Sequence, residues 1–117
     1  MELRVPEPLR STIAVDAETG LCSLRHSFIL TSGRLISDWG VADFAQLDHQ
    51  AMEVVRALAP ELIILGTGTR LRFPAAEITG PLQAAGIGLE VMDTPAACRT
   101  FNLLASDGRH VAAAIII

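Results

Sequence analysis

An uninterrupted apolar run at residues 111–117 constrains the fold of this 117-residue chain more than any other feature of its sequence. Successive side chains of a β-strand point to opposite faces of the sheet, and both faces of this run would be apolar. Such a strand belongs inside a sheet covered on both sides, because an exposed apolar edge invites aggregation. The run is also far shorter than the roughly 20 residues that span a bilayer. The sequence therefore predicts an α/β domain in layers, with residues 109–117 as an internal strand.

Two further segments fit strands of the same sheet. Residues 62–65 are apolar without alternation, as in a strand covered on both faces, and residues 87–92 form a second candidate. Between them we expect a helix from Pro74 to about residue 85, because proline is favoured in the first turn of a helix. Gly80 and Pro81 lie inside this helix, where proline removes a hydrogen bond, so this is the weakest of the predicted elements.

The next helix has clear start and stop signals. Thr94 is predicted as its N-cap, with Pro95 at the first helical position. Ala97 and Phe101 recur at helical spacing on one face. Gly108 ends the helix, since glycine readily adopts the left-handed conformation found after a helix C-terminus.

The first half of the chain predicts a hairpin followed by a helix. Residues 25–30 and 34–39 favour strands, and a three-residue connection ending in glycine joins them. Trp39, the single tryptophan, is expected to pack in the core. A helix should follow over about residues 47–58 and end before a proline. Asp43 or Asp48 is its expected N-cap.

The beginning of the chain is predicted to be an extended arm over residues 1–10, which contain two prolines. Residues 11–117 should then form a single α/β domain, since their number falls within the usual domain range. Within that domain, residues 11–15 favour a first strand and residues 16–20 a turn.

Composition excludes several classes of function. The net charge is −4, all nine bases are arginine and none are clustered, so we expect no nucleic acid partner. The two cysteines and three histidines lie far apart in sequence, which argues against a disulfide framework and a metal site. We expect no cofactor and no metal. The first residues lack the basic and apolar regions of a secretory signal, which predicts a cytoplasmic protein.

Gly66, Thr67 and Gly68 directly follow a predicted buried strand and could line a phosphate-binding loop. A dinucleotide fingerprint would need glycine at position 71, where leucine stands. A strand over residues 70–73, and not a helix, is expected to follow, so no helix N-terminus would face a pyrophosphate. We therefore reject a nucleotide fold and favour a tight turn with positive φ. A role in lining a ligand pocket is the alternative.

The start of the helix after residue 92 carries the richest polar cluster. A helix N-terminus attracts anions and can lower the pKa of a thiol, so Cys98 is a candidate nucleophile or redox-sensitive group. More often, a cysteine in such a place is a small buried hydrophobe. Asp93 and Arg99 could form an ion pair. Arg99 and Asn102 share a helix face and could line a pocket with Thr67 at the carboxyl ends of the strands.

Three blocks of sequence resemble those of a known family. They are residues 61–68, 90–102 and 107–114, in that order, and the resemblance covers nearly the whole chain from about residue 13. The family consists of small proteins of unknown function and includes a mitochondrial protein that helps to assemble respiratory complex I. The resemblance implies a compact α/β domain with a mixed sheet and helices packed against it. It implies no catalytic residues.

Two functions follow as hypotheses. The first is a non-enzymatic accessory protein that binds another protein and assists assembly of a respiratory or other membrane complex, as the resemblance implies. The second is a protein or enzyme that binds a small anion between the glycine turn and the helix start. Its candidate residues are Gly66, Thr67, Gly68, Asp93, Thr94, Arg99 and Asn102. No residue set is predicted to be catalytic.

Overall fold

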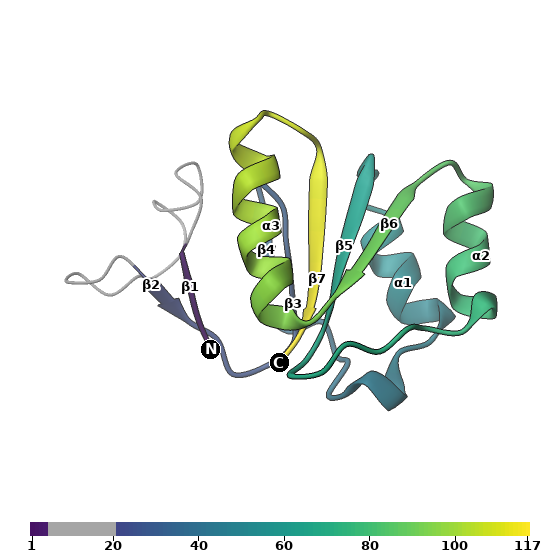
Figure 1. Cartoon of the computed structure of the whole chain (residues 1–117), viewed down its shortest axis with the longest axis horizontal. Helices are drawn as coiled ribbons and strands as arrows, with labels where there is room; N and C mark the ends of the chain where they lie inside the picture. The colour runs from purple at the N-terminus through teal and green to yellow at the C-terminus, as the bar shows by residue number, and fades with distance from the viewer. Residues whose placement is uncertain (5–20) are drawn as a thin grey trace.

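The structure, a computed structural model, describes residues 1–4 and 21–117 (Figure 1). Its centre is a mixed sheet of five strands with three α-helices packed on it, as predicted for the fold class. The predicted strand over residues 11–15 and the turn over 16–20 lie outside the described residues. Residues Glu2–Arg4 form strand β1, which pairs antiparallel with β2, Leu21–Ser23. The division into an arm and a domain stays a prediction.

The five-stranded sheet has the order β4-β3-β7-β5-β6. β5 runs parallel to both β6 and β7, whereas β3 runs antiparallel to β7 and to β4. The internal position predicted for the C-terminal apolar run is confirmed, because β7 lies between β3 and β5 and all six of its residues are buried. The strand bounds are Phe28–Leu30 for β3, Leu35–Ile36 for β4, Leu62–Thr67 for β5, Gly88–Met92 for β6 and Val111–Ile116 for β7.

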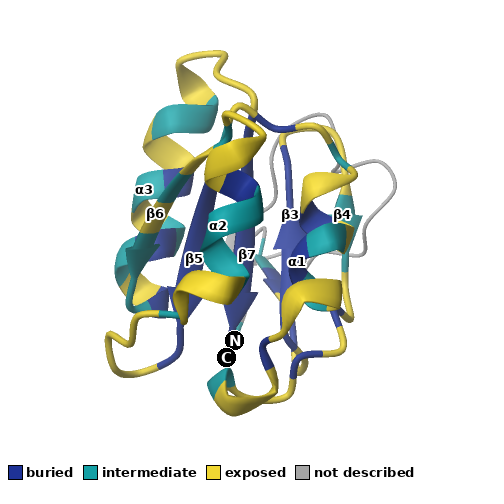
Figure 2. Ribbon diagram, turned by 90° about the vertical axis from the view of Figure 1, so that its right-hand side faces the viewer, coloured by how far each residue is buried: buried dark blue, intermediate teal, exposed yellow. Residues whose placement is uncertain are grey.

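Helices cover both faces of this sheet. Helices α1, His49–Arg56, and α2, Ala76–Ala84, lie on one face, and α3, Thr94–Ser106, lies on the other (Figures 1 and 2). Figure 2 shows the inner strands β3, β5 and β7 buried between these layers, whereas the outer strands β4 and β6 are only partly buried. Two hydrophobic clusters result, one beneath α1 and α2 and one beneath α3.

Alternation along β7 supplies side chains to both clusters. Ala112, Ala114 and Ile116 pack in the cluster beneath α1 and α2. Val111, Ala113 and Ile115 pack in the cluster beneath α3. Alanine at three central positions leaves room for large neighbours such as Phe101 of α3, which is 1 % exposed. Strand β7 therefore contributes buried side chains to both hydrophobic clusters.

The predicted hairpin is confirmed, with Ile29 opposite Ile36 and Leu30 opposite Leu35. Its connection spans residues 31–34 and is closed by the Thr31 N–H, which donates to the Arg34 carbonyl at 2.8 Å.

Trp39 lies in the core as predicted, and its indole Nε1 donates to the Ala51 carbonyl at 2.9 Å. This hydrogen bond satisfies the indole N–H, the one polar group of the buried tryptophan side chain.

Both predicted aspartate caps form, on different helices. Asp48 accepts from the Ala51 N–H at 2.8 Å and caps α1. Asp43 accepts from the Ala45 N–H at 2.9 Å and caps a short 3₁₀ helix, η2, at Phe44–Gln46. α1 ends before the proline at position 60, as expected.

Two predictions around α2 were inexact. Helix α2 begins at Ala76, two residues later than expected, and Ala75 precedes it without a side-chain cap. Residues 70–73 are not a strand, because the Thr67 hydroxyl binds backbone groups of Arg70 and Arg72 and folds this segment back against the end of β5. Pro81 does lie inside the helix, as predicted.

Candidate functional site

The carboxyl ends of the parallel strands β6, β5 and β7 meet at one edge of the sheet, where α3 begins. Ligands of open α/β sheets usually bind at this edge. The structure brings five of the seven candidate residues together here: Gly66, Thr67, Gly68, Asp93 and Thr94. Hydrogen bonds among their segments show what holds the edge together.

Thr94 is 7 % exposed and links three segments of the chain. Its hydroxyl donates to the Ile116 carbonyl at the end of β7 and accepts from the Gly68 N–H at 2.9 Å. Its backbone N–H also donates to the Gly68 carbonyl at 2.8 Å. The expectation that Thr94 caps α3 was wrong, because its side chain turns toward the sheet and Asp93 takes the capping position instead.

Asp93 accepts from the Ala96 N–H at 2.9 Å through its side chain and so caps α3. This carboxylate also complements the positive end of the helix dipole. Part of the anion-binding capacity of the helix N-terminus is therefore used within the protein. Among the described residues, Asp93 forms no ion pair with Arg99.

Thr67 is the second buried hydroxyl at this edge. Its Oγ1 lies 2.6 Å from the Arg70 carbonyl and 3.2 Å from the Met92 carbonyl, and it accepts from the Arg72 N–H at 3.2 Å. A hydroxyl has one proton and two lone pairs, so these contacts use its capacity.

The glycine turn differs from the prediction. Gly66 and Thr67 belong to β5, and only Gly68, with φ of +97°, has the left-handed conformation that glycine favours. Gly66 has a packing role instead. A Cβ at this position would lie 3.0 Å from Ile115 Cδ1 and 3.0 Å from Thr94 Oγ1. The missing side chain allows the first turn of α3 to approach β5.

Arg99 and Asn102 do not join this group. Both are exposed on α3, and neither lines the hollows next to Gly68. One apolar hollow of about 280 Å³ lies beside Gly68, Thr94 and Pro95. A second, of about 200 Å³, lies beside Thr67, Arg70 and Arg72.

Cys98 is partly buried on the α3 side of the sheet. Burial raises the pKa of its thiol to about 11, although the positive charge of Arg99 opposes this shift. The raised pKa disfavours the reactive-thiol alternative, and the packing of Cys98 against the cluster beneath α3 fits the favoured prediction of a small buried hydrophobe. A thiol of this kind is protonated at neutral pH and is a poor nucleophile.

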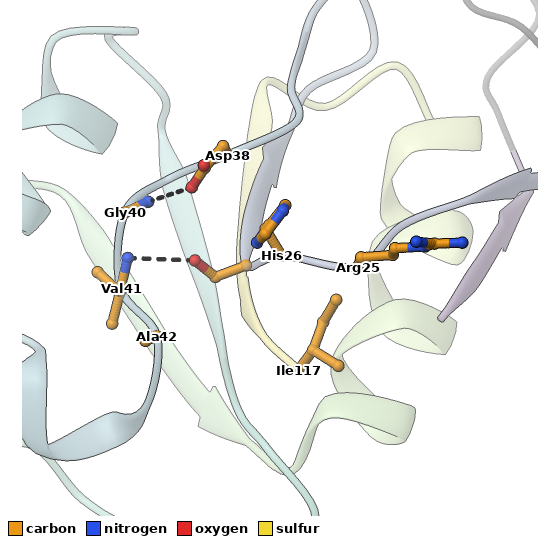
Figure 3. A pocket seen from close by; sticks show the side chains of 8 residues that line it. Arg25, His26, Asp38, Gly40, Val41, Ala42 and Ile117 are labelled. Atoms are coloured by element: carbon orange, nitrogen blue, oxygen red, sulfur yellow. Dashed lines mark hydrogen bonds between the residues drawn. The ribbon is translucent and has the colours of Figure 1, made fainter.

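A third hollow, of about 260 Å³, was not predicted from the sequence (Figure 3). Its wall includes Ser27, whose Oγ accepts from the Val41 N–H at 3.2 Å, and Asp38, which accepts from the Gly40 N–H at 2.9 Å. Both polar groups thus hold the loop after β4. The predicted hairpin places residues 25–27 near residues 38–40, but the sequence carries no signal that a hollow forms between them.

In the described part of the chain, potential metal ligands are not clustered and buried polar side-chain atoms are paired. No three side chains of His, Cys, Asp or Glu lie close enough together there to hold a metal ion. Every buried side-chain nitrogen and oxygen among residues 21–117 has a hydrogen-bond partner. Within these residues, no helix combines the length and hydropathy needed to cross a bilayer.

Comparison with known proteins yields one family. Residues 10–116 match the model of a protein family of unknown function, DUF498/DUF598. Among curated proteins, the chain is similar to the NADH dehydrogenase [ubiquinone] 1 alpha subcomplex assembly factor 3 of Danio rerio, with 40% identity over 83 residues. That alignment covers 69% of this chain and 48% of the relative. The chain thus spans about half the length of the assembly factors that it matches.

A bacterial relative and a solved structure extend the comparison. The 13 kDa major membrane protein of Francisella tularensis is 29% identical over 92 residues, which cover 78% of this chain and 75% of that protein. An NMR structure of a protein from Xanthomonas campestris has a TM-score of 0.74 and 43% identity, covering 83% of this chain and 72% of the other.

Proposed function

This chain belongs to the DUF498/DUF598 family of proteins of unknown function, and from that premise we propose that it is a non-enzymatic accessory protein that binds another protein. Its task in this proposal is to assist the assembly of a respiratory or other membrane complex. The observation that carries the proposal is the similarity to a complex I assembly factor over 83 residues.

The geometry of the candidate site supports binding over catalysis. The hydroxyls of Thr67 and Thr94 are used in internal hydrogen bonds, and the Cys98 thiol has a raised pKa. Catalysis would need an acid, base or nucleophile that is free to react. A protein that acts through its surface has no such need.

The test is affinity purification of the tagged protein from its native host after mild cross-linking. We expect one or more subunits of a membrane complex to be enriched reproducibly over an untagged strain. Deletion of the gene should also reduce the amount of that complex on native gels, and the intact gene should restore it. The absence of any reproducible partner, together with normal complex levels in the deletion strain, would refute the proposal.

Binding of a small anion at Gly66, Thr67, Gly68, Asp93, Thr94, Arg99 and Asn102 is the alternative proposal. The hollow beside Gly68 and Thr94 favours it, whereas the exposed positions of Arg99 and Asn102 on α3 count against it. Titration with inorganic phosphate, followed by amide NMR, separates the two. Saturable shifts at Gly68 and Ala96 would support the anion site, and unchanged shifts would reject it.

We further propose that the protein acts in the cytoplasm. Cys22 and Cys98 are both free thiols, as is usual in a reducing compartment. Cell fractionation with a tagged chain tests this location, and recovery in the periplasmic or extracellular fraction would contradict it.

A further inference from the structure

Strand β6 forms one edge of the five-stranded sheet, and β5 is its only pairing partner among the residues that the structure describes (Figure 1). The Gly88 N–H donates to the Glu61 carbonyl at 3.1 Å, so Gly88 directs its backbone groups toward β5. Because these groups alternate in direction along a strand, those of Glu90 also face β5. The N–H and C=O groups of Leu89 and Val91 therefore point away from the sheet. Within residues 1–4 and 21–117 they have no partner on this side, and they form the row of donors and acceptors that an added strand requires.

A hollow of about 530 Å³ runs beside this edge. Its lining includes residues 87–91 with most of β6, Gln83 of α2, and Phe73 with Pro74 from the segment before α2. Phe73 is 73 % exposed, the highest value among the large hydrophobic residues described. Backbone groups and an exposed aromatic ring thus face the same space, which is the combination found where extended peptides bind.

Apart from the charge of Glu90, the edge lacks the usual protection against strand pairing. Natural edges are commonly very short, or carry lysine, proline or a bulge. The opposite edge, β4, has two residues and fits this rule, but β6 has five residues and contains neither lysine nor proline. Its single charged residue is Glu90.

Glu90 indicates what the added strand carries. Leu89 and Val91 pack with the cluster beneath α1 and α2, so Glu90 projects from the opposite face of the sheet, where it is exposed. A symmetric antiparallel pairing of two copies through Leu89 and Val91 would place Glu90 opposite its own equivalent. Like charges directly opposite each other destabilise a sheet. A second copy is thus disfavoured, and a strand with arginine or lysine at this position is favoured.

We propose that β6 binds an extended segment of a partner protein as an additional strand, with a basic residue opposite Glu90 and an apolar residue against Phe73. This inference rests on the proposed function and specifies where the partner binds. The backbone of Leu89 and Val91 supplies the hydrogen bonds, and Glu90 selects the charge.

The probe is a phage-displayed library of random nine-residue peptides, followed by synthesis of the enriched sequences. We expect enrichment of β-favouring peptides with a central Arg or Lys. On binding, the Leu89 and Val91 amides should become protected from hydrogen exchange in NMR spectra. Protection elsewhere, or failure to select any peptide, would overturn the proposal.

Three variants test the contacts. Leu89→Pro removes an outward N–H together with a leucine side chain that packs with the cluster beneath α1 and α2. It should weaken binding by about tenfold or more, and retained exchange protection of the β5 amides would show that the sheet is intact. Glu90→Arg should weaken binding of basic peptides by about two- to fivefold and should improve binding of peptides with a central Glu. Phe73→Ala changes an exposed side chain and should weaken binding without changing stability.

The matched control is Asp107→Arg, which makes the same change in charge at the far end of α3, where a cation suits the helix C-terminus. It should bind peptides like the wild type. Equal effects of Glu90→Arg and Asp107→Arg would refute the assigned charge pair.

The outcomes for site and function are separable. If the affinity purification above recovers a partner equally well with wild type and Leu89→Pro, the proposed function stands and the β6 site is refuted. If it recovers no partner at all, the proposed function is refuted whatever peptides bind. Concentration-dependent dimers that Leu89→Pro abolishes would show that a second copy occupies the edge, which also overturns the proposal.

Discussion

Replacing Thr94 with valine tests whether the hydroxyl of this residue holds the candidate site together. Valine has nearly the same shape as threonine, so the packing of α3 against β5 should persist. The change leaves the Gly68 N–H and the Ile116 carbonyl without the partner that each has in the native protein. Both groups are buried, so water cannot replace the lost hydroxyl without opening the edge of the sheet.

The expected cost follows from these two groups. A buried donor or acceptor left unpaired costs about 1–3 kcal/mol. Two such groups, with some relaxation, give a loss of about 2–4 kcal/mol, a large part of the 5–15 kcal/mol that stabilises a typical domain. For a chain of this length, roughly 4 °C of Tm accompanies each kcal/mol. The variant should therefore melt about 8–16 °C below the wild type.

Urea unfolding followed by circular dichroism measures the loss, and an unchanged m-value would show that the variant is folded before unfolding. Thr100→Val on the same helix is the matched control, because its hydroxyl contacts only the weakly accepting sulfur of Met92 at 3.3 Å. It should cost less than about 1 kcal/mol. Thr94→Ser keeps the hydroxyl and should lose only about 1 kcal/mol, for one methyl group. Equal losses for Thr94→Val and Thr100→Val would refute the reasoning.

Three further changes probe the same region. Gly66→Ala places a Cβ 3.0 Å from two side-chain atoms and should lower the free energy of unfolding in urea by about 1–3 kcal/mol. The control Gly33→Ala, where a Cβ would have no atom within 4 Å, should change that free energy by less than about 0.5 kcal/mol. Similar values for both variants would contradict the packing argument. Asp93→Ala removes the cap of α3 and should lower stability by about 1 kcal/mol, with Asp93→Asn close to wild type; thermal melts that do not separate the two variants would count against the cap. The Cys98 pKa, raised from 9.0 to about 11, implies stability that is complete below pH 9 and is lost as the pH rises from 9 toward 11, because the unfolded chain releases the proton first. The chain has no tyrosine and all its bases are arginine, so urea unfolding at pH 8 and pH 10 should show a fall in stability that Cys98→Ala reduces, and an equal fall in both proteins would disprove the assignment.

Much of the fold could be predicted because its signals are local. The apolar run that became β7 has two buried faces wherever it lies, and proline and glycine mark the ends of α3 in the sequence itself. The hairpin of β3 and β4 likewise follows from two β-favouring runs with a short connection. Each of these features depends on residues close together in the chain.

The predictions that were wrong concern features whose local structure depends on contacts with distant segments of the chain. Asp93 and Thr94 are both good caps, and the choice between them depends on Ile116 and Gly68, which draw the threonine hydroxyl into the sheet. Residues 70–73 favour a strand by composition, but the Thr67 hydroxyl at the end of β5 binds backbone groups of Arg70 and Arg72 and folds this segment back.

The candidate site was predictable only in part. Thr67 and Thr94 meet because parallel strands end at one edge, a general rule of α/β sheets. Whether their hydroxyls are free for a ligand depends on individual backbone atoms, which no spacing encodes. The edge position of β6, on which the proposed docking site rests, depends on strand order and is equally hidden in the sequence.

The central place of β7 has a consequence for how the protein folds. Pairing Phe28 with Ile115 joins positions separated by most of the chain, and such distant contacts slow folding because they close a long loop. During synthesis β7 is the last strand of the sheet to be made. Until then, β3 and β5 each have an unpaired apolar edge on the side where β7 will lie. At that stage the nascent chain exposes two strand edges that can pair wrongly with other chains. We therefore expect chaperone dependence to be greatest just before residues 111–116 emerge and to fall sharply once they have paired.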